Sequence, residues 1–254
     1  MSLESQIADL VSATNTLIAT YNGKKNEITA AVNAAIAGIP ETSRTWWVDQ
    51  VNGLDTNAGN SSAAPFKTIG KALASTPASG QCSVYLLSDY VMTASIAVSC
   101  AYLLIYGPNA VTSGVAPKLR PQYFLATDAS TQMAGFIFYS QANNVELRNV
   151  DIVLPSVAGV VPAPTITRVN SFIKTNSSSS LPPVLGVMLQ TVVVTKAADF
   201  YGALIGLSAS SLAFGCFAAT FPSDMLGKYV STVSAAGGTA ANTLSQITTN
   251  LSTL

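Results

Sequence analysis

The sequence predicts a mainly β chain with a helical segment at each end. Two apolar seams with coiled-coil spacing, at 3–39 and 230–254, enclose a central region without helical periodicity. Between residues 83 and 200, short apolar runs alternate with turn residues. Short strands in series, joined by turns instead of long crossovers, are typical of a β-sandwich, a barrel or a β-solenoid.

The N-terminal segment carries a heptad seam in which apolar residues alternate in steps of four and three. Gly23 interrupts this seam, which resumes in a shifted frame, and Gly38 and Pro40 end the predicted helix. A single helix cannot bury so narrow a row of apolar residues by itself. This favours a coiled coil between identical chains over a helix that lies on its own domain. The expected contact residues are Ile7, Leu10, Leu17, Tyr21, Ile28 and Val32.

The C-terminal segment keeps the same spacing from Val230 to the end of the chain. Glycine is unfavourable within a helix, so Gly237 and Gly238 restrict the prediction to a helix over 239–254, with Thr239 as its N-cap. A helix of this length is marginal in water, and identical chains are its simplest partners. The expected contact residues are Leu244, Ile247 and Leu251.

The central region shows the alternation of half-buried strands. In 136–155 this alternation slips by one position at Asn149 and Val150, which predicts a bend between two strands. The uncharged run 200–221 is long enough to span a bilayer, but serines dilute it and no basic cluster flanks it. We therefore expect no membrane insertion, and buried strands between three chains or within a β-helix instead.

Composition excludes several classes of function. Twelve basic residues balance twelve acidic ones, which argues against nucleic acid as a partner. The chain has no His, and its three Cys are widely spaced, so we expect no metal and no cofactor. The N-terminus lacks the apolar segment of a signal peptide, and free cysteines suit assembly in a reducing cytoplasm.

The polar loop after Trp46 and Trp47 raises the question of a metal site. Asp55, Asn57 and Gly59 match the start of an EF-hand loop. The sixth position of that loop is normally Gly and the twelfth a bidentate Glu, whereas this chain has Asn60 and Phe66. A tight calcium site is therefore not expected.

Two pairs of carboxylates are candidates for glycosidic cleavage, Asp49 with Asp55 and Glu146 with Asp151. Asp and Asn beside Gly are equally the residues that tight turns require. A serine nucleophile is unsupported, since the chain has neither a GxSxG motif nor a histidine base. We predict that the protein is not an enzyme.

The segment WWVDQVNGLDTNAGNSSAAPFKTIGKALAS closely resembles the entry of the right-handed parallel β-helix, pectate-lyase-like, of bacteriophage tail fibres and tailspikes. In that family an aromatic–VD strand leads to an NGxDxNxG turn, and PFKTI opens a short helix that lids the first coil. The resemblance extends well over 45–155 and loosely over 155–215. It implies that Asp49 and Asp55 hold loop backbone and do no chemistry. The implied cap residues are Trp46, Trp47, Phe66, Ile69 and Leu73.

The resemblance implies a trimeric fibre: a short right-handed parallel β-helix flanked by N-terminal and C-terminal coiled-coil helices. Residues 1–40 would be the coiled coil that attaches to the virion, and 41–82 the linker strand, turn and capping helix. Residues 83–222 would form the β-helix shaft, and 223–254 the C-terminal trimerisation segment.

The function implied is that of a structural phage virion fibre, a tail fibre that attaches to the host cell surface and is made in the bacterial cytoplasm. The protein would form a homotrimer. Its further partners would be another virion protein, bound by the N-terminal helix, and a host surface glycan. The alternatives are a tailspike polysaccharide depolymerase and a collar or head decoration fibre without a receptor. Candidate glycan contacts are Tyr102, Tyr106, Tyr123, Tyr139, Asn143 and Asn144.

Overall fold

The computed structural model describes residues 2–37, 42–108, 115–139, 142–231, 233 and 247–252, with the side chains of 35–37 excepted. The chain divides into two compact units, Met1–Glu41 and Thr42–Leu254. The first unit is a helix and the second is built from parallel sheets.

The first unit contains α1 (Leu3–Ala37), which confirms the predicted N-terminal helix. It is continuous through Gly23, where the sequence predicted a shift in the frame of the apolar seam within one helix. A side chain at this glycine would meet open space, so nothing in the fold requires glycine there. Every described side chain of α1 is exposed, including the expected contact residues Ile7, Leu10, Leu17, Tyr21, Ile28 and Val32.

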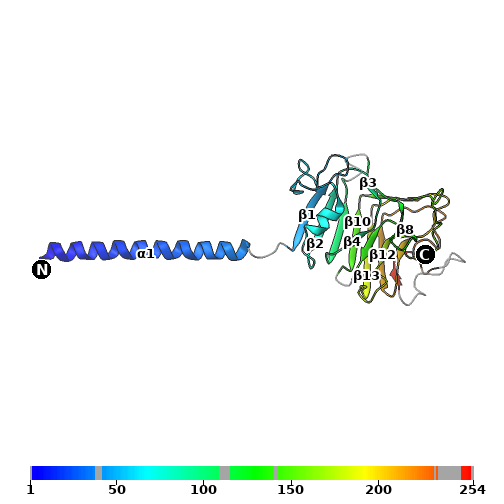
Figure 1. The fold of residues 1–254 in the computed structure, drawn as a ribbon. Helices are drawn as coiled ribbons and strands as arrows, with labels where there is room; N and C mark the ends of the chain where they lie inside the picture. Colours follow the sequence, from blue (N-terminus) through cyan, green and yellow to red (C-terminus); the bar gives the residue numbers. More distant parts are fainter. Residues whose placement is uncertain are drawn as a thin grey trace. The chain divides into compact units, whose positions relative to one another are not determined.

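The second unit consists of three parallel sheets and one hairpin (Figure 1). Sheet A contains, in spatial order, β1 (Ser43–Val48), β2 (Gln81–Leu86), β5 (Tyr102–Tyr106), β10 (Asn144–Arg148), β13 (Val184–Gln190), β16 (Ser211–Phe217) and β17 (Ile247–Thr249). Sheet B contains β3 (Tyr90–Met92), β6 (Lys118–Pro121), β11 (Asp151–Leu154) and β14 (Val194–Lys196). Sheet C contains β4 (Ile96–Val98), β9 (Phe136–Phe138), β12 (Ser171–Thr175) and β15 (Ala203–Gly206). The hairpin pairs β7 (Tyr123–Leu125) with β8 (Thr131–Met133).

The strand order defines a parallel coil. From β2 onward the chain visits sheets A, B and C in turn and then repeats the circuit, so that each strand pairs with its counterpart one coil later. This is the topology of a parallel β-helix, and it confirms the prediction of a mainly β fold with short strands in series. Because the register is kept, equivalent side chains stack inside the coil. One such interior row is Val84, Ile105, Leu147 and Leu189.

After three of the strands of sheet A, the turn that leaves the sheet begins with a single residue of left-handed backbone. Asn149, Thr191 and Ala218 follow β10, β13 and β16 directly, with φ of 52°, 54° and 51°. The amide of Asn149 donates to the carbonyl of Gln190 at 3.0 Å, and that of Thr191 donates to Phe217 at 2.8 Å. The bend predicted at Asn149 is confirmed.

The N-terminal end of the coil is closed by α2 (Ile69–Ala74), which contacts β1, β2 and β4 and is drawn in cyan in Figure 1. Thr68 caps this helix, its hydroxyl accepting from the amide of Lys71 at 3.0 Å. The helix buries Ile69, Ala72 and Leu73.

The two tryptophans of β1 have opposite orientations. Trp46 is buried, its ring lies 5.1 Å from that of Phe66, and its Nε1 donates to Thr76 Oγ1 at 2.9 Å. Trp47 is half-buried beside Tyr85 on the outer face of sheet A. Trp46 therefore belongs to the closed end of the coil, whereas Trp47 belongs to its surface.

The loop carboxylates hold backbone, as the sequence predicted. Asp49 Oδ1 accepts from the amides of Val51 at 3.0 Å and Asn52 at 3.2 Å. Asp55 Oδ1 accepts from the amides of Lys67 at 3.0 Å and Thr68 at 2.9 Å. Both side chains thus fix the connection between β1 and α2.

Side-chain amides continue two sheets beyond their last strands. Gln50 pairs with β3, accepting from the amide of Val91 at 2.7 Å and donating to its carbonyl at 2.9 Å. The side chain of Asn250 likewise accepts from the amide of Cys216 in β16 at 2.9 Å and donates to its carbonyl at 2.7 Å. Each amide satisfies one residue of a sheet edge that would otherwise invite pairing with another chain.

The predicted C-terminal helix is wrong at 247–249, which form β17 parallel to β16. Ile247 and Val230 are buried in the core, and Leu251 packs against it. The predicted contact residue Leu244 and the N-cap Thr239 lie outside the described residues. Pairing with β16 satisfies the backbone of β17 on one side, and the β-branched residues of β17 suit a strand, whereas a short helix is marginal alone.

The uncharged run 200–221 forms β15 and β16, as strands were predicted there. Leu204, Leu212 and Phe214 of this run lie in the core of their own coil, as expected for buried strands within a β-helix. Burial between three chains stays a prediction. Among the helices that the structure describes, none is long and apolar enough to cross a membrane.

Candidate functional site

The outer face of sheet A carries three rows of side chains, because the parallel register keeps alternate residues in phase from coil to coil. The first row is Ser43, Gln81, Tyr102, Asn144, Gly186, Ala213 and Thr248. The second row is Thr45, Ser83, Leu104, Glu146, Met188 and Gly215. The third row is Trp47, Tyr85, Tyr106, Arg148, Gln190 and Phe217.

The third row consists of planar side chains. The ring centroids of Trp47 and Tyr85 are 6.1 Å apart, and those of Tyr85 and Tyr106 are 4.9 Å apart with the planes nearly perpendicular. Burial, with a smaller contribution from Tyr85, raises the pKa of Tyr106, so its hydroxyl stays protonated at neutral pH. The row ends at Phe217, which is 67% exposed.

A polar cluster joins the first row to the third. The hydroxyl of Tyr102 donates to Glu146 Oε2, and the guanidinium of Arg148 donates to Oε1 of the same carboxylate through Nε at 2.9 Å and through Nη2. Burial and the bond to Glu146 raise the pKa of Tyr102 to about 12. The cluster is therefore a neutral ion pair with a phenol donor attached.

A groove of about 730 Å³ runs across the strands at the C-terminal half of this face. Its floor is made of small residues, Gly186, Ala213 and Gly215, and Phe217 is among the larger side chains that line it. A Cβ at Gly186 would lie 2.3 Å from Asn144 Oδ1, and one at Gly215 would lie 2.7 Å from Met188 Cε. Glycine at both positions therefore lets the neighbouring side chains lie flat over the sheet.

The groove has the chemistry of a binding surface for a neutral, hydroxylated ligand. Ligand pockets typically enclose roughly 300–1,000 Å³ and combine apolar walls with a few polar groups. Here Phe217 and Met188 supply apolar surface, while Asn144, Thr248 and Asn250 supply donors and acceptors at its margins. Among the described residues that line the groove, Glu146 is the only charged one, and it is already paired with Arg148.

The carboxylates proposed for catalysis are each bound within the fold, and Asp49 and Asp55 accept from loop backbone. Glu146 lies in sheet A and is bound by Tyr102 and Arg148. Asp151 lies in sheet B and accepts from the amide of Val193 at 3.1 Å. Of these two carboxylates, Glu146 lines the groove and Asp151 is not among the lining residues.

The six residues predicted as glycan contacts fall into two groups by their place in the fold. Tyr102, Tyr106 and Asn144 lie on the outer face of sheet A, with Asn143 beside it accepting from Asn144 Nδ2 at 2.7 Å. Tyr139 is exposed just after β9, and Tyr123 belongs to the hairpin, where its hydroxyl donates to the carbonyl of Tyr201 at 2.6 Å.

Sequence reasoning missed several residues of this face, which are Trp47, Tyr85, Arg148, Met188, Gln190 and Phe217. Met188 belongs to the second row and the other five to the third, and both rows became visible only with the strand register. The alternation within each strand was a signal for which residues point outward, but it could not align one strand with the next.

Within the described part of the chain, no three Cys, Asp or Glu side chains gather in a way that could hold a metal ion. No protein-family model and no curated protein matches the chain.

Proposed function

We propose that this protein is a non-enzymatic fibre component of a phage virion that attaches to the host cell surface through a glycan. The observation that carries the proposal is the neutral groove of sheet A beside a row of planar side chains. Aromatic faces pack on the apolar faces of sugar rings, and paired amides and hydroxyls bond their hydroxyl groups. The virion origin and the right-handed sense of the coil rest on the resemblance to tail-fibre and tailspike β-helices.

The proposed assembly is a homotrimer joined through α1, whose N-terminal end would dock on another virion protein. This proposal is supported by the exposure of the described seam residues, among them Leu10 at 68% and Leu17 at 69%. Apolar residues at this spacing on a long helix normally pack against partner helices. The three chains would then present three copies of the same groove, which raises avidity for a repetitive surface.

The assembly is tested by the mass of the full-length protein in solution, measured by light scattering. We expect three times the chain mass for the wild type and a smaller species for Leu17→Asp. The control is Ala19→Asp, which places the same charge on roughly the opposite side of the helix, since consecutive residues turn by about 100°. A monomeric wild type, or equal effects of both variants, would refute association through the seam.

Attachment is tested by binding of the purified protein to a glycan array and to host cells. Phe217→Ala should weaken binding about tenfold, since losing one stacked aromatic removes about 1–1.5 kcal/mol beyond its buried area. Leu125→Ala, which removes an exposed side chain from the hairpin, is the control and should bind as the wild type does. Wild-type binding that both variants leave unchanged would exclude the groove as the attachment site.

The alternative of a polysaccharide depolymerase keeps one supporting observation, the carboxylate of Glu146 in the groove wall. It predicts release of oligosaccharides from a bound glycan and loss of that release in Glu146→Gln. Binding without release excludes it. A protein that binds neither the array nor host cells would instead be a collar or head decoration fibre.

A further inference from the structure

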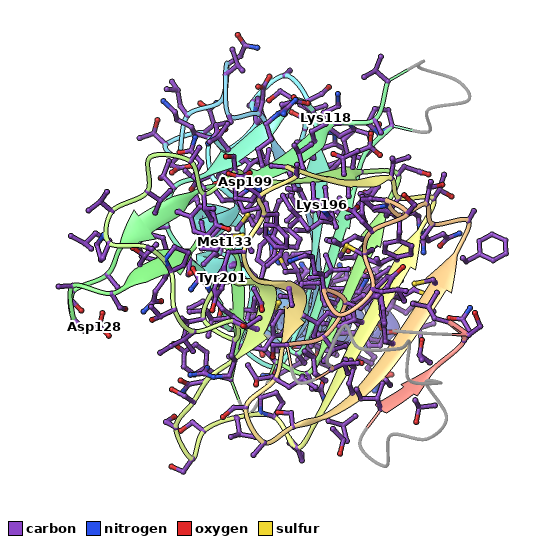
Figure 2. All side chains as sticks on the ribbon, turned by 90° about the vertical axis from the view of Figure 1, so that its right-hand side faces the viewer. Lys118, Asp128, Met133, Lys196, Asp199 and Tyr201 are labelled. Carbon is purple, nitrogen blue, oxygen red and sulfur yellow. The ribbon has the colours of Figure 1, made fainter. Side chains whose placement is uncertain are left out.

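In two coils of the β-helix, the connection from sheet B to sheet C is a long insertion, here called an excursion. These are the second coil, which contains β5, β6 and β9, and the third, which contains β10, β11 and β12. The second coil inserts the β7–β8 hairpin, here called the arm (123–133), and the third inserts the covering loop (155–170). Figure 2 shows the arm projecting from the coil, with Asp128 at its outer end and Met133 near the body. Excursions at one edge of a solenoid are commonly its functional surface.

Side chains fasten these two excursions to each other and to the coil. Asn170 Nδ2 donates to the carbonyls of Thr131 in the arm, at 3.2 Å, and of Ile166 in the covering loop, at 2.9 Å. The hydroxyl of Thr131 donates to the carbonyl of Pro162. The arm and the covering loop therefore form one packed layer over sheet C.

Lys174 of β12 lies beneath this layer and is 2% exposed. Its Nζ donates to the carbonyl of Met133 in the arm at 2.5 Å and to the carbonyl of Val169 in the covering loop at 2.9 Å. One buried amine thus joins both excursions to sheet C. Both of its acceptors are uncharged.

No carboxylate binds Lys174 within the part of the chain that the structure describes. The charged group facing it is Arg168 of the covering loop, which is also a cation. The acid of the arm, Asp128, accepts from Ser130 in the turn, and Asp199 of the next coil accepts from Ser156. The other titratable groups of this edge, Tyr123 and Tyr201, are bound to each other through the phenol of Tyr123 and the backbone of Tyr201.

We propose that Lys174 is a proton-controlled latch, which holds the arm and the covering loop closed most tightly when its amine is neutral. A buried ammonium without an anion is costly, whereas a neutral amine still has two hydrogens for its two carbonyl acceptors. Opening of the layer returns the amine to water, where the charged form is stable. Proton uptake therefore favours the open layer, and this inference is independent of the proposed attachment function.

The sign and the pH range follow from the two states. Burial, together with Arg168, lowers the pKa of Lys174 from its ordinary 10.5 to about 7 in the closed layer. Between these values the open layer holds a proton that the closed layer lacks, so closure becomes more favourable as pH rises. The slope reaches about tenfold in the closing constant per pH unit. This pH dependence vanishes below about pH 7, where Lys174 is protonated in both the open and the closed layer.

Hydrogen exchange of the full-length protein between pH 7 and 9, corrected for intrinsic exchange rates, tests the latch. Protection of amides in the arm and the covering loop should rise by up to about tenfold per pH unit, while sheet A stays constant. In Lys174→Met the same amides should show no slope, and Lys67→Met, an exposed control, should retain the wild-type slope.

Two results would overturn the inference. One is a wild-type arm whose protection is independent of pH, which requires no variant and holds even if Lys174→Met fails to fold. The other is a slope that persists in Lys174→Met or in Lys174→Gln, since the titrating group would then lie elsewhere.

Discussion

Replacing Asp49 by Ala should destabilise the closed end of the β-helix. Asp49 directly follows β1 and is 8% exposed. Its Oδ1 accepts from the amides of Val51 and Asn52 and from Ser88 Oγ at 2.7 Å, and its Oδ2 accepts from Asn52 Nδ2 at 3.0 Å. The variant removes the acceptor for all four donors at once.

The expected loss in the free energy of unfolding is about 2–4 kcal/mol. A typical hydrogen bond contributes about 1 kcal/mol net, and a donor left buried costs more. Val51 and Asn52 are exposed, so their amides regain water in the variant, whereas Ser88 is only partly exposed. We therefore take about 1 kcal/mol for each lost bond instead of the larger values for fully buried charged groups.

The pH dependence gives an independent check. Burial works against the ionised form, but the bonds from Ser88, Asn52 and Val51 outweigh it and hold the pKa of Asp49 below its usual range. A depressed pKa contributes stability above the ordinary carboxyl pKa, and this is lost as pH falls through the lower folded value. The difference between wild type and Asp49→Ala should therefore shrink at pH values below about 4.

Urea unfolding of the full-length protein, at one fixed concentration, measures this effect through tryptophan fluorescence. Both tryptophans of the chain lie in β1, so the signal reports on this end of the coil. Asp9→Ala in α1, where the side chain is exposed, is the control and should change stability by less than about 0.5 kcal/mol. A loss for Asp49→Ala no larger than that of the control would refute the structural role.

Three further predictions concern backbone and core. Thr191→Gly should raise stability by about 1 kcal/mol, because its left-handed backbone disfavours a β-branched residue; an unchanged or lower urea midpoint would contradict this. Leu73→Ala, which removes a buried side chain of α2, should lower the free energy of unfolding by about 2–5 kcal/mol. The control Lys71→Ala should lower it by less than about 0.5 kcal/mol, and equal urea midpoints for the two variants would argue against α2 as a cap. Gly23→Ala should stabilise α1 by up to about 1 kcal/mol, seen as a higher melting temperature of the helical circular dichroism signal, and a lower one would place a partner at that position.

The outcome for each element follows from the range of the interactions that stabilise it. The N-terminal helix and the strand bend at Asn149 depend on residues close in sequence, and both were predicted. The backbone-holding roles of Asp49 and Asp55 were implied by the resemblance, and Asp55 binds amides 12 and 13 residues away. The prediction of a C-terminal helix was wrong at Ile247. Apolar residues spaced three and four apart also occur where a strand enters a core, so this spacing does not distinguish the two. Its neighbour β16, paired through Leu212, cannot be recognised from local spacing.

The candidate site was predicted only in part for the same reason. Tyr102 and Tyr106 were identified as surface aromatics, and the structure aligns them with Glu146, Arg148 and Phe217 of later coils. In a coil of parallel strands, residues that share a row are separated in sequence by a whole circuit of varying length. The arm and the covering loop lengthen two of these circuits, so no fixed period reveals the row.

By itself the sequence determined the class of the fold, the capping segment with its turn carboxylates, and the neutral character of the chain. These are set by local conformational preference and by composition. Only the tertiary structure decided which side chains meet across coils, including the groove of sheet A and the burial of Lys174 under the arm. Such contacts depend on register and loop length, which are fixed when the coils stack and bury their apolar interior.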